Sequence, residues 1–211
     1  MGDGAAVESL LREELQEAAK QAETGVTEAP IEVYGDSSYG GADTLECLDN
    51  AGIEANVKVQ PAATRDGMHT LDDFAIDLEN KTATCPIGRT IKLRVLASGE
   101  MHGNFGVLCK GCPQLATCTQ AKSGRALRIL PKFGLISRYR THQRSEEWKA
   151  KYRSTRPKIE RKIAHLMRNR HGGRRARVRG TSRVRQDFAF LAAAVNLVRI
   201  AKLQAAQVSV G

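Results

Sequence analysis

The sequence predicts an α/β protein with a small β-rich insertion, and three observations lead to this fold class. Residues 1–60 alternate helical and strand-like patterns, residues 61–134 hold short strand-like runs separated by Gly and Pro, and residues 135–211 are helical again. Helices and strands that alternate with short connections are typical of parallel α/β arrangements. We therefore predict three parts with these boundaries: an acidic helix with the first αβ elements of the core, the insertion, and the basic helices that complete the core.

The first part combines helical spacing of leucines with the alternation of strands. Asp43 or Thr44 is a candidate cap for a helix in the middle of this part. Gly52 follows that helix in the usual position of a left-handed cap. We predict helices over residues 7–22 and 43–51 and strands over residues 31–34 and 53–59.

The insertion and the third part differ in their elements. Helical spacing resumes at Ser137, and residues 146–167 form one helix or two, because Pro157 must start or kink a helix. A long, largely apolar helix is predicted over residues 186–207. In the insertion we predict strands over residues 74–78, 90–96, 105–108 and 126–130.

Two features bear on the compartment of the protein. The most apolar stretch carries Arg199 and Lys202, so no run of about 18 uncharged apolar residues exists and we predict no membrane span. The acidic beginning of the chain lacks the basic and apolar pattern of a secretory signal. We therefore expect a cytoplasmic protein.

Charge is distributed unevenly along the chain. Residues 1–80 contain 4 Lys and Arg against 18 Asp and Glu, residues 81–130 contain 8 against 1, and residues 131–211 contain 21 against 4. A segment this basic attracts polyanions, of which nucleic acid is the commonest. Arg predominates there, and its fork suits phosphate better than Lys does. The alternative is a solvated helical face that balances the acidic first third.

Four of the five cysteines lie in the predicted insertion and follow the pattern C-x23-C-x2-C-x5-C. A C-x2-C pair lets two thiolates turn inward on one tight loop, and two further thiolates complete a tetrahedron around zinc. Disulfides are less favoured in a cytoplasmic chain, and unpaired structural thiols are a third alternative. We call these residues the cysteine cluster: Cys85, Cys109, Cys112 and Cys118.

Two carboxylates stand out as candidates for chemistry. Asp36 follows a short apolar strand, and the carboxyl ends of parallel strands are where α/β folds place their sites. Glu160 is the single acid between Trp148 and Gln186, in a strongly basic segment. It could pair with Arg156 on the same helix face. The alternative is a metal-binding carboxylate of the kind that phosphoryl transfer on nucleic acid requires.

Three segments resemble DDE transposases of bacterial insertion sequences. Residues 33–40 (VYGDSSYG), followed by LDNAGI at 48–53, are similar to the second-Asp segment of that family. Residues 84–88 (TCPIG) and the later cysteines resemble the cysteine-bearing insertion of one branch. Residues 152–161 (YRSTRPKIER) and 175–180 (RARVRG) resemble the carboxy-terminal Glu segment.

The resemblance implies an incomplete ribonuclease-H-like fold, with strands four and five, flanking helices and the cysteine-bearing insertion. It implies that Asp36 is the second acid and Glu160 the third of a set that binds two Mg²⁺ ions and drives strand cleavage and transfer at transposon ends. Tyr152 and Arg156 would lie near the DNA backbone. With the neighbouring basic residues they form our predicted DNA-binding residues: Tyr152, Arg153, Arg156, Arg161, Lys162, Arg168, Arg174, Arg175 and Arg177.

The chain departs from the family pattern at the first acid. Asp3 alone precedes Asp36 among the aspartates, and it lies before the first predicted helix rather than on a strand. Met167 stands where the family has a Lys seven residues after the Glu, and Thr155 stands where the Arg is expected. We therefore expect the carboxy-terminal part of a transposase, inactive alone, which binds DNA and can form a homo-oligomer.

Two other function classes compete with this interpretation. One is a non-catalytic, zinc-containing protein whose Arg-rich helical tail binds DNA or RNA. The other is a basic structural protein without a nucleic-acid role, which leaves the ordered Asp, Cys and Glu segments unexplained.

Overall fold

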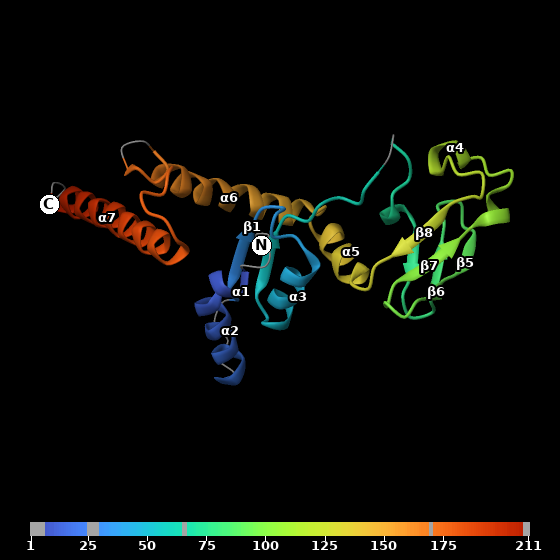
Figure 1. Cartoon of the computed structure of the whole chain (residues 1–211), viewed down its shortest axis with the longest axis horizontal. Coiled ribbons are helices and arrows are strands. Elements are labelled where there is room, and N and C mark those ends of the chain that lie inside the picture. Colours follow the sequence, from blue (N-terminus) through green and yellow to red (C-terminus); the bar gives the residue numbers. More distant parts are fainter. Residues whose placement is uncertain (1–6, 25–29, 65–66, 169–170, 209–211) are drawn as a thin grey trace. The chain divides into compact units, whose positions relative to one another are not determined.

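The computed structural model describes residues 7–24, 30–64, 67–168 and 171–208 (Figure 1). The chain divides into two compact units, Met1–Lys149 and Ala150–Gly211, and we describe each by itself. The first unit contains every strand of the described residues, and the second consists of helices. The prediction of a mixed α/β protein is confirmed at this level. The three-part division of the chain stays a prediction.

The first unit opens with two helices and a parallel pair of strands. Strand β1 (Glu32–Gly35) pairs in parallel with β2 (Glu54–Val57), and helix α3 (Ala42–Asn50) connects them. The expected parallel arrangement is thus confirmed, because a helical crossover brings the second strand back in the same direction. The first predicted helix is divided: α1 covers Val7–Leu10 and α2 covers Arg12–Thr24.

The ends of α3 show one confirmed signal and one wrong prediction. Gly52, just past the helix, has a φ of 68°, the left-handed conformation that glycine adopts without strain. The N-cap, however, is Gly41, which makes no side-chain cap, and not Asp43 or Thr44. Thr44 is instead buried in the helix.

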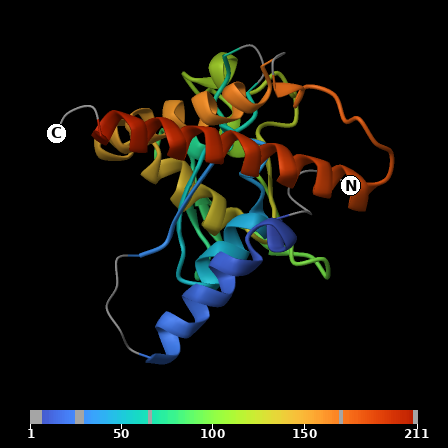
Figure 2. The ribbon, with the colours of Figure 1, turned by 90° about the vertical axis from the view of Figure 1, so that its left-hand side faces the viewer.

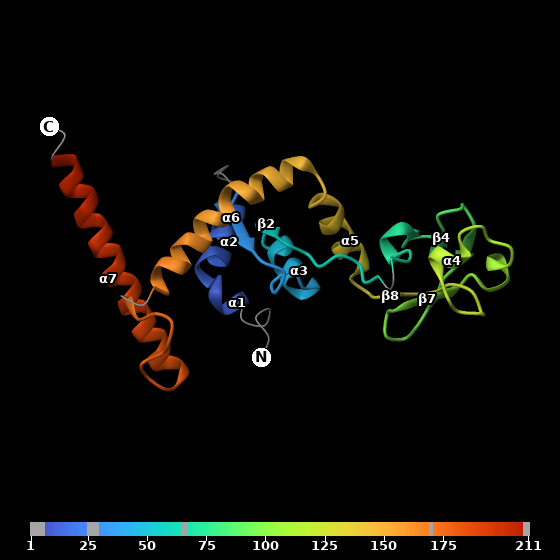
Figure 3. The same cartoon turned by 90° about the horizontal axis from the view of Figure 1, so that it is seen from above.

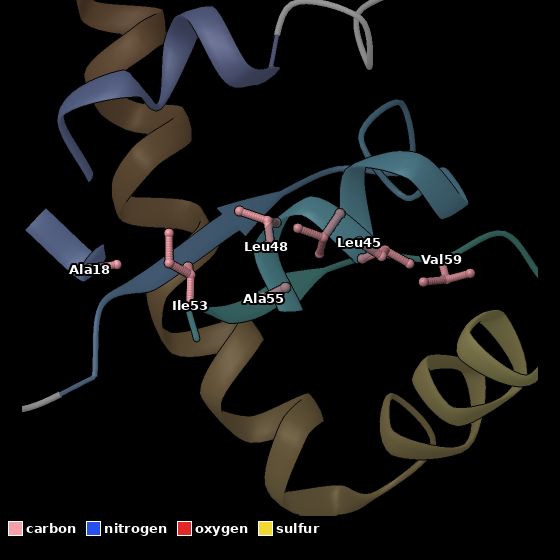
Figure 4. Close-up of a cluster of buried hydrophobic side chains, with 7 residues drawn as sticks. Ala18, Leu45, Leu48, Ile53, Ala55 and Val59 are labelled. Carbon is pink, nitrogen blue, oxygen red and sulfur yellow. The ribbon is translucent and has the colours of Figure 1, made fainter. Parts of the chain in front are cut away.

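A hydrophobic cluster holds this part together (Figure 4). Leu45 and Leu48 of α3 are fully buried and pack with Ile53, Ala55 and other residues of the β2 segment. Apolar residues three apart on a helix share one face, which explains why α3 covers the strands. Leu135, Ile136 and Tyr139 of helix α5 (Phe133–His142) pack against the same cluster. Residues distant in sequence thus complete this core. Helix α5 begins at Phe133, four residues before the predicted Ser137.

The β-rich part, in which Figure 3 labels β4, β7 and β8, consists of two three-stranded antiparallel sheets. Predicted strands at 74–78, 90–96 and 126–130 are confirmed in substance, although the second is divided at Leu93. The prediction at 105–108 is wrong: this segment is the 3-10 helix η3 (Gly106–Cys109). The sheets contain β3 (Ala75–Asp77), β4 (Thr82–Thr84) and β5 (Thr90–Lys92), and β6 (Arg94–Val95), β7 (Met101–Asn104) and β8 (Ala126–Ile129).

A second hydrophobic cluster combines residues of both sheets and of their connections. It contains Phe74, Ala83, Phe105 and Ile129, with Cys118 among its buried members. A Cβ added at Gly103 would meet the side chains of Ile91 and Leu93 at 2.7 Å. The small residue on β7 therefore allows the two sheets to approach closely.

The second unit contains most of α6 (Glu146–Leu166) and α7 (Thr181–Val208), the long helix drawn in red in Figure 2. Helix α6 is one continuous helix, which settles the alternative left open by the sequence, with Pro157 inside it. Helix α7 begins five residues before the predicted start at Gln186. A Cβ at Gly173 would meet the carbonyl oxygen of Leu166 at 2.4 Å and Leu191 at 2.9 Å, so this loop packs tightly between the two helices.

Candidate active site, basic surface and cysteine cluster

Asp36 lies directly after β1, at the carboxyl end of the parallel pair. Its Oδ1 accepts a hydrogen bond from the backbone N–H of Ser38 at 2.9 Å, and the N–H of Tyr39 bonds to its carbonyl oxygen at 3.2 Å. These bonds form a tight turn that holds the half-buried carboxylate at the strand end. The carboxylate thus shapes its own loop and does not cap α3, whose N-cap is Gly41.

Gly40 explains how the Asp36 loop lies against the next strand. A Cβ at this position would be 2.4 Å from the carbonyl oxygen of Lys58 and 3.0 Å from the Cα of Val59. The backbone of the loop therefore touches the backbone that continues β2, an approach that needs glycine. Gly35, at the end of β1, is buried against Tyr39 and Val57. The two glycines fix the position of Asp36 relative to the sheet.

Glu160 lies on α6, in the second unit, with its side chain 61% exposed. The Nε of Arg156 donates a hydrogen bond to its Oε1 at 3.0 Å, one helical turn away. This is the pairing that the sequence spacing offered as one alternative. Asp36 and Glu160 belong to different units, and each is placed within its own. Asp3, the one aspartate before Asp36, lies outside the described residues.

Many of the predicted DNA-binding residues are exposed on the second unit. Arg156 and Tyr152 are half-buried, and Arg177 pairs with Asp187 through its Nη2 and Oδ1 at 2.7 Å. Exposed guanidinium groups can present their donors to phosphate oxygens. The exposed predicted residues are Arg153, Arg161, Lys162, Arg168, Arg174, Arg175 and Arg177.

Lys132, just before α5, and the basic residues of α5 have a different role, because they pair with acids of the first unit. The Nζ of Lys132 bonds to Asp43 at 2.5 Å and to Glu46 at 2.7 Å, both on α3. Arg138 and Tyr139 both donate to the Asp49 carboxylate. Helix α5 therefore fits the alternative of a basic helical face that balances the acidic first third of the chain. The remaining excess of positive charge lies in the second unit.

Arg140 and Arg144 extend this pairing to the start of the β-rich part. Both bind Asp72, at 2.9 and 2.7 Å, and the Asp72 side chain is only 7% exposed. The Nε of Arg140 also donates to the carbonyl oxygen of Gln60. A nearly buried carboxylate with two cationic partners fixes the segment that precedes β3.

The cysteine cluster lies around a single small cavity. All four thiols line a space of about 20 Å³, together with Phe74, Phe105 and Arg125. All five cysteines of the chain are free thiols. Burial raises the pKa of the Cys118 thiol, and the proximity of the other three thiols raises it further. Within the described ranges, no group of three or more His, Cys, Asp or Glu is already assembled at the spacing that holds a metal ion.

Arg125 is a residue of this cavity that the sequence did not reveal. Its guanidinium donates to the carbonyl oxygens of Cys118 and His69 and lies 5.4 Å from the centre of the Phe74 ring. Its Nε is buried without a hydrogen-bond partner. No local pattern distinguishes it from the other arginines, since its place depends on the fold.

Comparison with known proteins identifies the family. A family model described as "Transposase DDE domain" matches residues 84–201, which is more than half of the chain. The chain belongs to this family of DDE transposase domains. The match includes Glu160 and all the predicted DNA-binding residues, and Asp36 lies before it. No curated protein and no solved structure matches the chain.

The predicted family is therefore confirmed. Membership makes the function transposase-like and implies DNA binding, and DDE transposases in general use a divalent metal ion.

One feature of α7 bears on the predicted absence of a membrane span. Residues Thr181–Ala205 are long and apolar enough, by length and composition, to cross a membrane, and none of the most apolar window is buried. This finding weakens the exclusion that we based on Arg199 and Lys202. A single helix of this kind is weak evidence for a membrane protein, and an apolar helix also serves to cover a protein core.

Proposed function

We propose that this chain takes part in DNA transposition as a portion of a catalytic domain of ribonuclease-H-like fold, with β1 and β2 as its fourth and fifth strands. The observation that carries the proposal is the family match over residues 84–201, which includes Glu160 and the Arg-rich segment around it. The parallel pair β1–β2, with Asp36 at its carboxyl end, supports the same fold.

In this proposal, Asp36 and Glu160 hold divalent metal. Both offer carboxylate oxygens, the donors that Mg²⁺ prefers, and neither residue is fully buried. Mg²⁺ ions bound there would activate the attacking oxygen and stabilise the leaving oxygen in phosphoryl transfer. The ion pair with Arg156 orients the Glu160 carboxylate until the metal competes for it.

The exposed arginines of the second unit would bind the phosphates on either side of the scissile position at a transposon end. Arginine forks make two parallel hydrogen bonds to one phosphate, which fixes the strand in register without reading its sequence. The given sequence offers no carboxylate that corresponds to the family's first Asp. We therefore propose that the chain alone does not cleave DNA. Association into a homo-oligomer and a cytoplasmic location belong to the same proposal.

Iron-directed cleavage of the polypeptide tests whether Asp36 and Glu160 share an ion. Fe²⁺ replaces Mg²⁺ at oxygen sites and, with ascorbate and peroxide, cuts the backbone beside the bound ion. We expect cuts near both positions 36 and 160, which excess Mg²⁺ suppresses and which Asp36→Asn or Glu160→Gln abolishes at both places. Glu147→Gln, at an exposed acid of the same helix α6, is the matched control and should leave the cuts unchanged. Cuts at one position only would refute a shared metal site.

The second candidate function is a nucleic-acid-binding protein that contains zinc and does no chemistry. The gathering of the cysteine cluster around one cavity favours it. The same experiment separates the two: iron cuts at positions 36 and 160 support the transposase site, and their absence with intact DNA binding supports the second candidate.

A further inference from the structure

The cysteine cluster lies where two separate parts of the β-rich region meet. Cys85 follows β4, in the hairpin of the first three-stranded sheet. The other three cysteines lie in the long connection between β7 and β8 of the second sheet, at the end of η3, in the following turn and at the end of helix α4 (Leu115–Cys118). All four cysteines thus converge on one cavity of about 20 Å³, although Cys85 precedes the next of them by 24 positions.

Two tight turns present the thiols to the cavity. The N–H of Cys112 bonds to the carbonyl oxygen of Cys109 at 3.2 Å, and Gly111 between them has a φ of 66°. The N–H of Gly88 bonds to the carbonyl oxygen of Cys85 at 2.8 Å, and Gly88 has a φ of 83°. Turns of this kind let a thiol and nearby backbone N–H groups face the same point, as thiolate metal sites require.

The surroundings of the cavity suit a cluster of negative thiolates. The backbone N–H of Arg125 points at the Sγ of Cys109, 3.4 Å away. The Arg125 guanidinium lines the same cavity, which places a positive charge beside the thiols, and its Nε has no hydrogen-bond partner. Four thiolates around a dication leave two net negative charges, which a neighbouring guanidinium and N–H donors stabilise.

We propose that the cysteine cluster binds one zinc ion through its four thiolates. Sulfur ligands in a tetrahedral set of four select zinc or iron among biological cations. A cavity of about 10–15 Å³ is enough for one water molecule. The cavity of about 20 Å³ at the cysteine cluster therefore has room for a zinc ion. The thiols of the described chain are gathered but not yet at ligand spacing, so metal binding draws the two glycine-containing turns together.

The proposed ion would be a structural link between the two sheets. It ties the β4–β5 hairpin to the β7–β8 connection, whose sheets also meet where β5 packs against Gly103 of β7. A site with four protein ligands has no open position for substrate, so the role is structural and not catalytic. This inference does not depend on the carboxylates of the proposed transposase site.

Metal analysis of the purified full-length chain tests the proposal. We expect about one zinc per chain, and less than about one tenth of that in Cys112→Ser. Cys47→Ser is the matched control, because Cys47 lies on α3 and does not line the cavity, and it should keep the full zinc content. A wild-type chain without zinc after expression in zinc-supplemented medium, or one that carries iron, would overturn the assignment.

Thiol titration and cobalt substitution of the wild-type chain give a readout that does not depend on how the variant folds. With zinc bound, only Cys47 should react readily with a thiol reagent, and after chelation under denaturing conditions all five cysteines should react. Co²⁺ should give the intense visible bands of a tetrahedral site and the near-ultraviolet bands of thiolate coordination. A mass spectrum that shows the loss of hydrogens through disulfides, or weak octahedral cobalt bands, would refute the zinc site.

Discussion

At the scale of single residues, the loop that carries Asp36 contains two adjacent glycines, of which only one is required by its surroundings. Gly40 touches the backbone of the Lys58 segment, whereas a Cβ at Gly41 would meet nothing within 4 Å. Close backbone approach makes the first irreplaceable, and open space with extended dihedrals makes the second tolerant. The position of the candidate catalytic carboxylate therefore depends on Gly40.

We predict that Gly40→Ala lowers the free energy of unfolding by about 1–3 kcal/mol, because the added methyl group must displace backbone. Gly41→Ser should leave stability unchanged or raise it by a few tenths of a kcal/mol, since Ser at the N-cap supplies the side-chain acceptor that α3 lacks. Urea unfolding of both variants measures the difference. An equal effect of the two substitutions would contradict the close approach of the Gly40 loop to the Lys58 carbonyl.

At the same scale, two of the predicted site residues form an ion pair with each other. Arg156 and Glu160 pair across one helical turn, as their spacing allows. A helical pair of this spacing, with an exposed carboxylate, contributes little to stability, about 0.3–0.5 kcal/mol, so a metal ion or a phosphate can replace it. The pairing is therefore compatible with the proposed role of both residues.

At the scale of elements, α5 is the connector that assembles the first unit. Its C-cap residue Gln143 accepts a hydrogen bond from the N–H of Val59 and donates one to the carbonyl oxygen of Val59, both at 3.0 Å. The amide side chain thus continues the hydrogen-bonding pattern of a neighbouring strand beyond the end of β2. Val59 is only 2% exposed, so water cannot readily replace this partner.

Gln143→Ala should destabilise the chain by about 1–3 kcal/mol, because it leaves two polar groups of a buried backbone without their partner. Thr141→Ala, at an exposed position of the same helix, should change the free energy of unfolding by less than about 0.5 kcal/mol. Thermal or urea unfolding under identical conditions gives the comparison. A Gln143→Ala variant as stable as the control would show that the amide pairing contributes nothing.

Helix α7 presents the opposite case, an element with apolar residues that the described structure leaves uncovered. Phe190 is 75% exposed and Leu197 66% exposed, while Leu191 is half-buried against the loop at Gly173. Exposed apolar surface of this extent is uncommon on soluble proteins. The helix is stable as such because its alanines and leucines favour helical conformation.

Two identical substitutions on α7 should have different effects. Leu191→Gln should lower the free energy of unfolding by about 1–2 kcal/mol, since it places an amide against a packed loop. Leu197→Gln should change it by less than about 0.5 kcal/mol, since the side chain is already in water. Circular dichroism at increasing urea follows the helix in both variants. A loss of stability at Leu197 as large as that at Leu191 would show that this face is covered in solution.

At the scale of the whole molecule, the basic residues divide into a set that neutralises nearby acids and a set that is exposed and could bind DNA. Basic residues at α5 neutralise the acidic α3, and the rest of the basic excess lies on exposed positions of the second unit. Net charge along the sequence therefore overstates the charge available for DNA, and the ion pairs show which part is already used. The second unit is the part that we expect to dominate DNA binding.

The salt dependence of DNA binding tests this division. Replacing Arg174 and Arg175 by Gln should reduce the slope of log K against log salt concentration by about 0.9 for each phosphate that the variant no longer binds. Replacing Lys132 and Arg138 by Gln removes the same charge at α5 and should leave the slope nearly unchanged, because those side chains pair with acids. Fluorescence anisotropy with a labelled duplex measures both. Equal reductions in the two double variants would attribute binding to net charge alone.

Local patterns predicted the elements whose signals lie within a few residues. The strands beside Val33 and Ala55, the helix that ends before Gly52 and the strand at Ala126–Ile129 all have such signals, and all are confirmed. The prediction at 105–108 is wrong because apolar residues in a 3-10 helix and in a strand have similar composition over four positions. The candidate acids were chosen from their neighbours and from family resemblance, and their joint role stays a prediction.

The sequence by itself determined the family, the polarity of charge, the parallel αβ order and the identity of the four cysteines, because each depends on residue types in a fixed local order. Only the tertiary structure decided which charges neutralise one another, why Gly40 is required, and that Arg125 joins the cysteine cluster at one cavity. These outcomes depend on contacts between residues that are distant in the chain. Close packing and ion pairing act through space, so no local pattern encodes them.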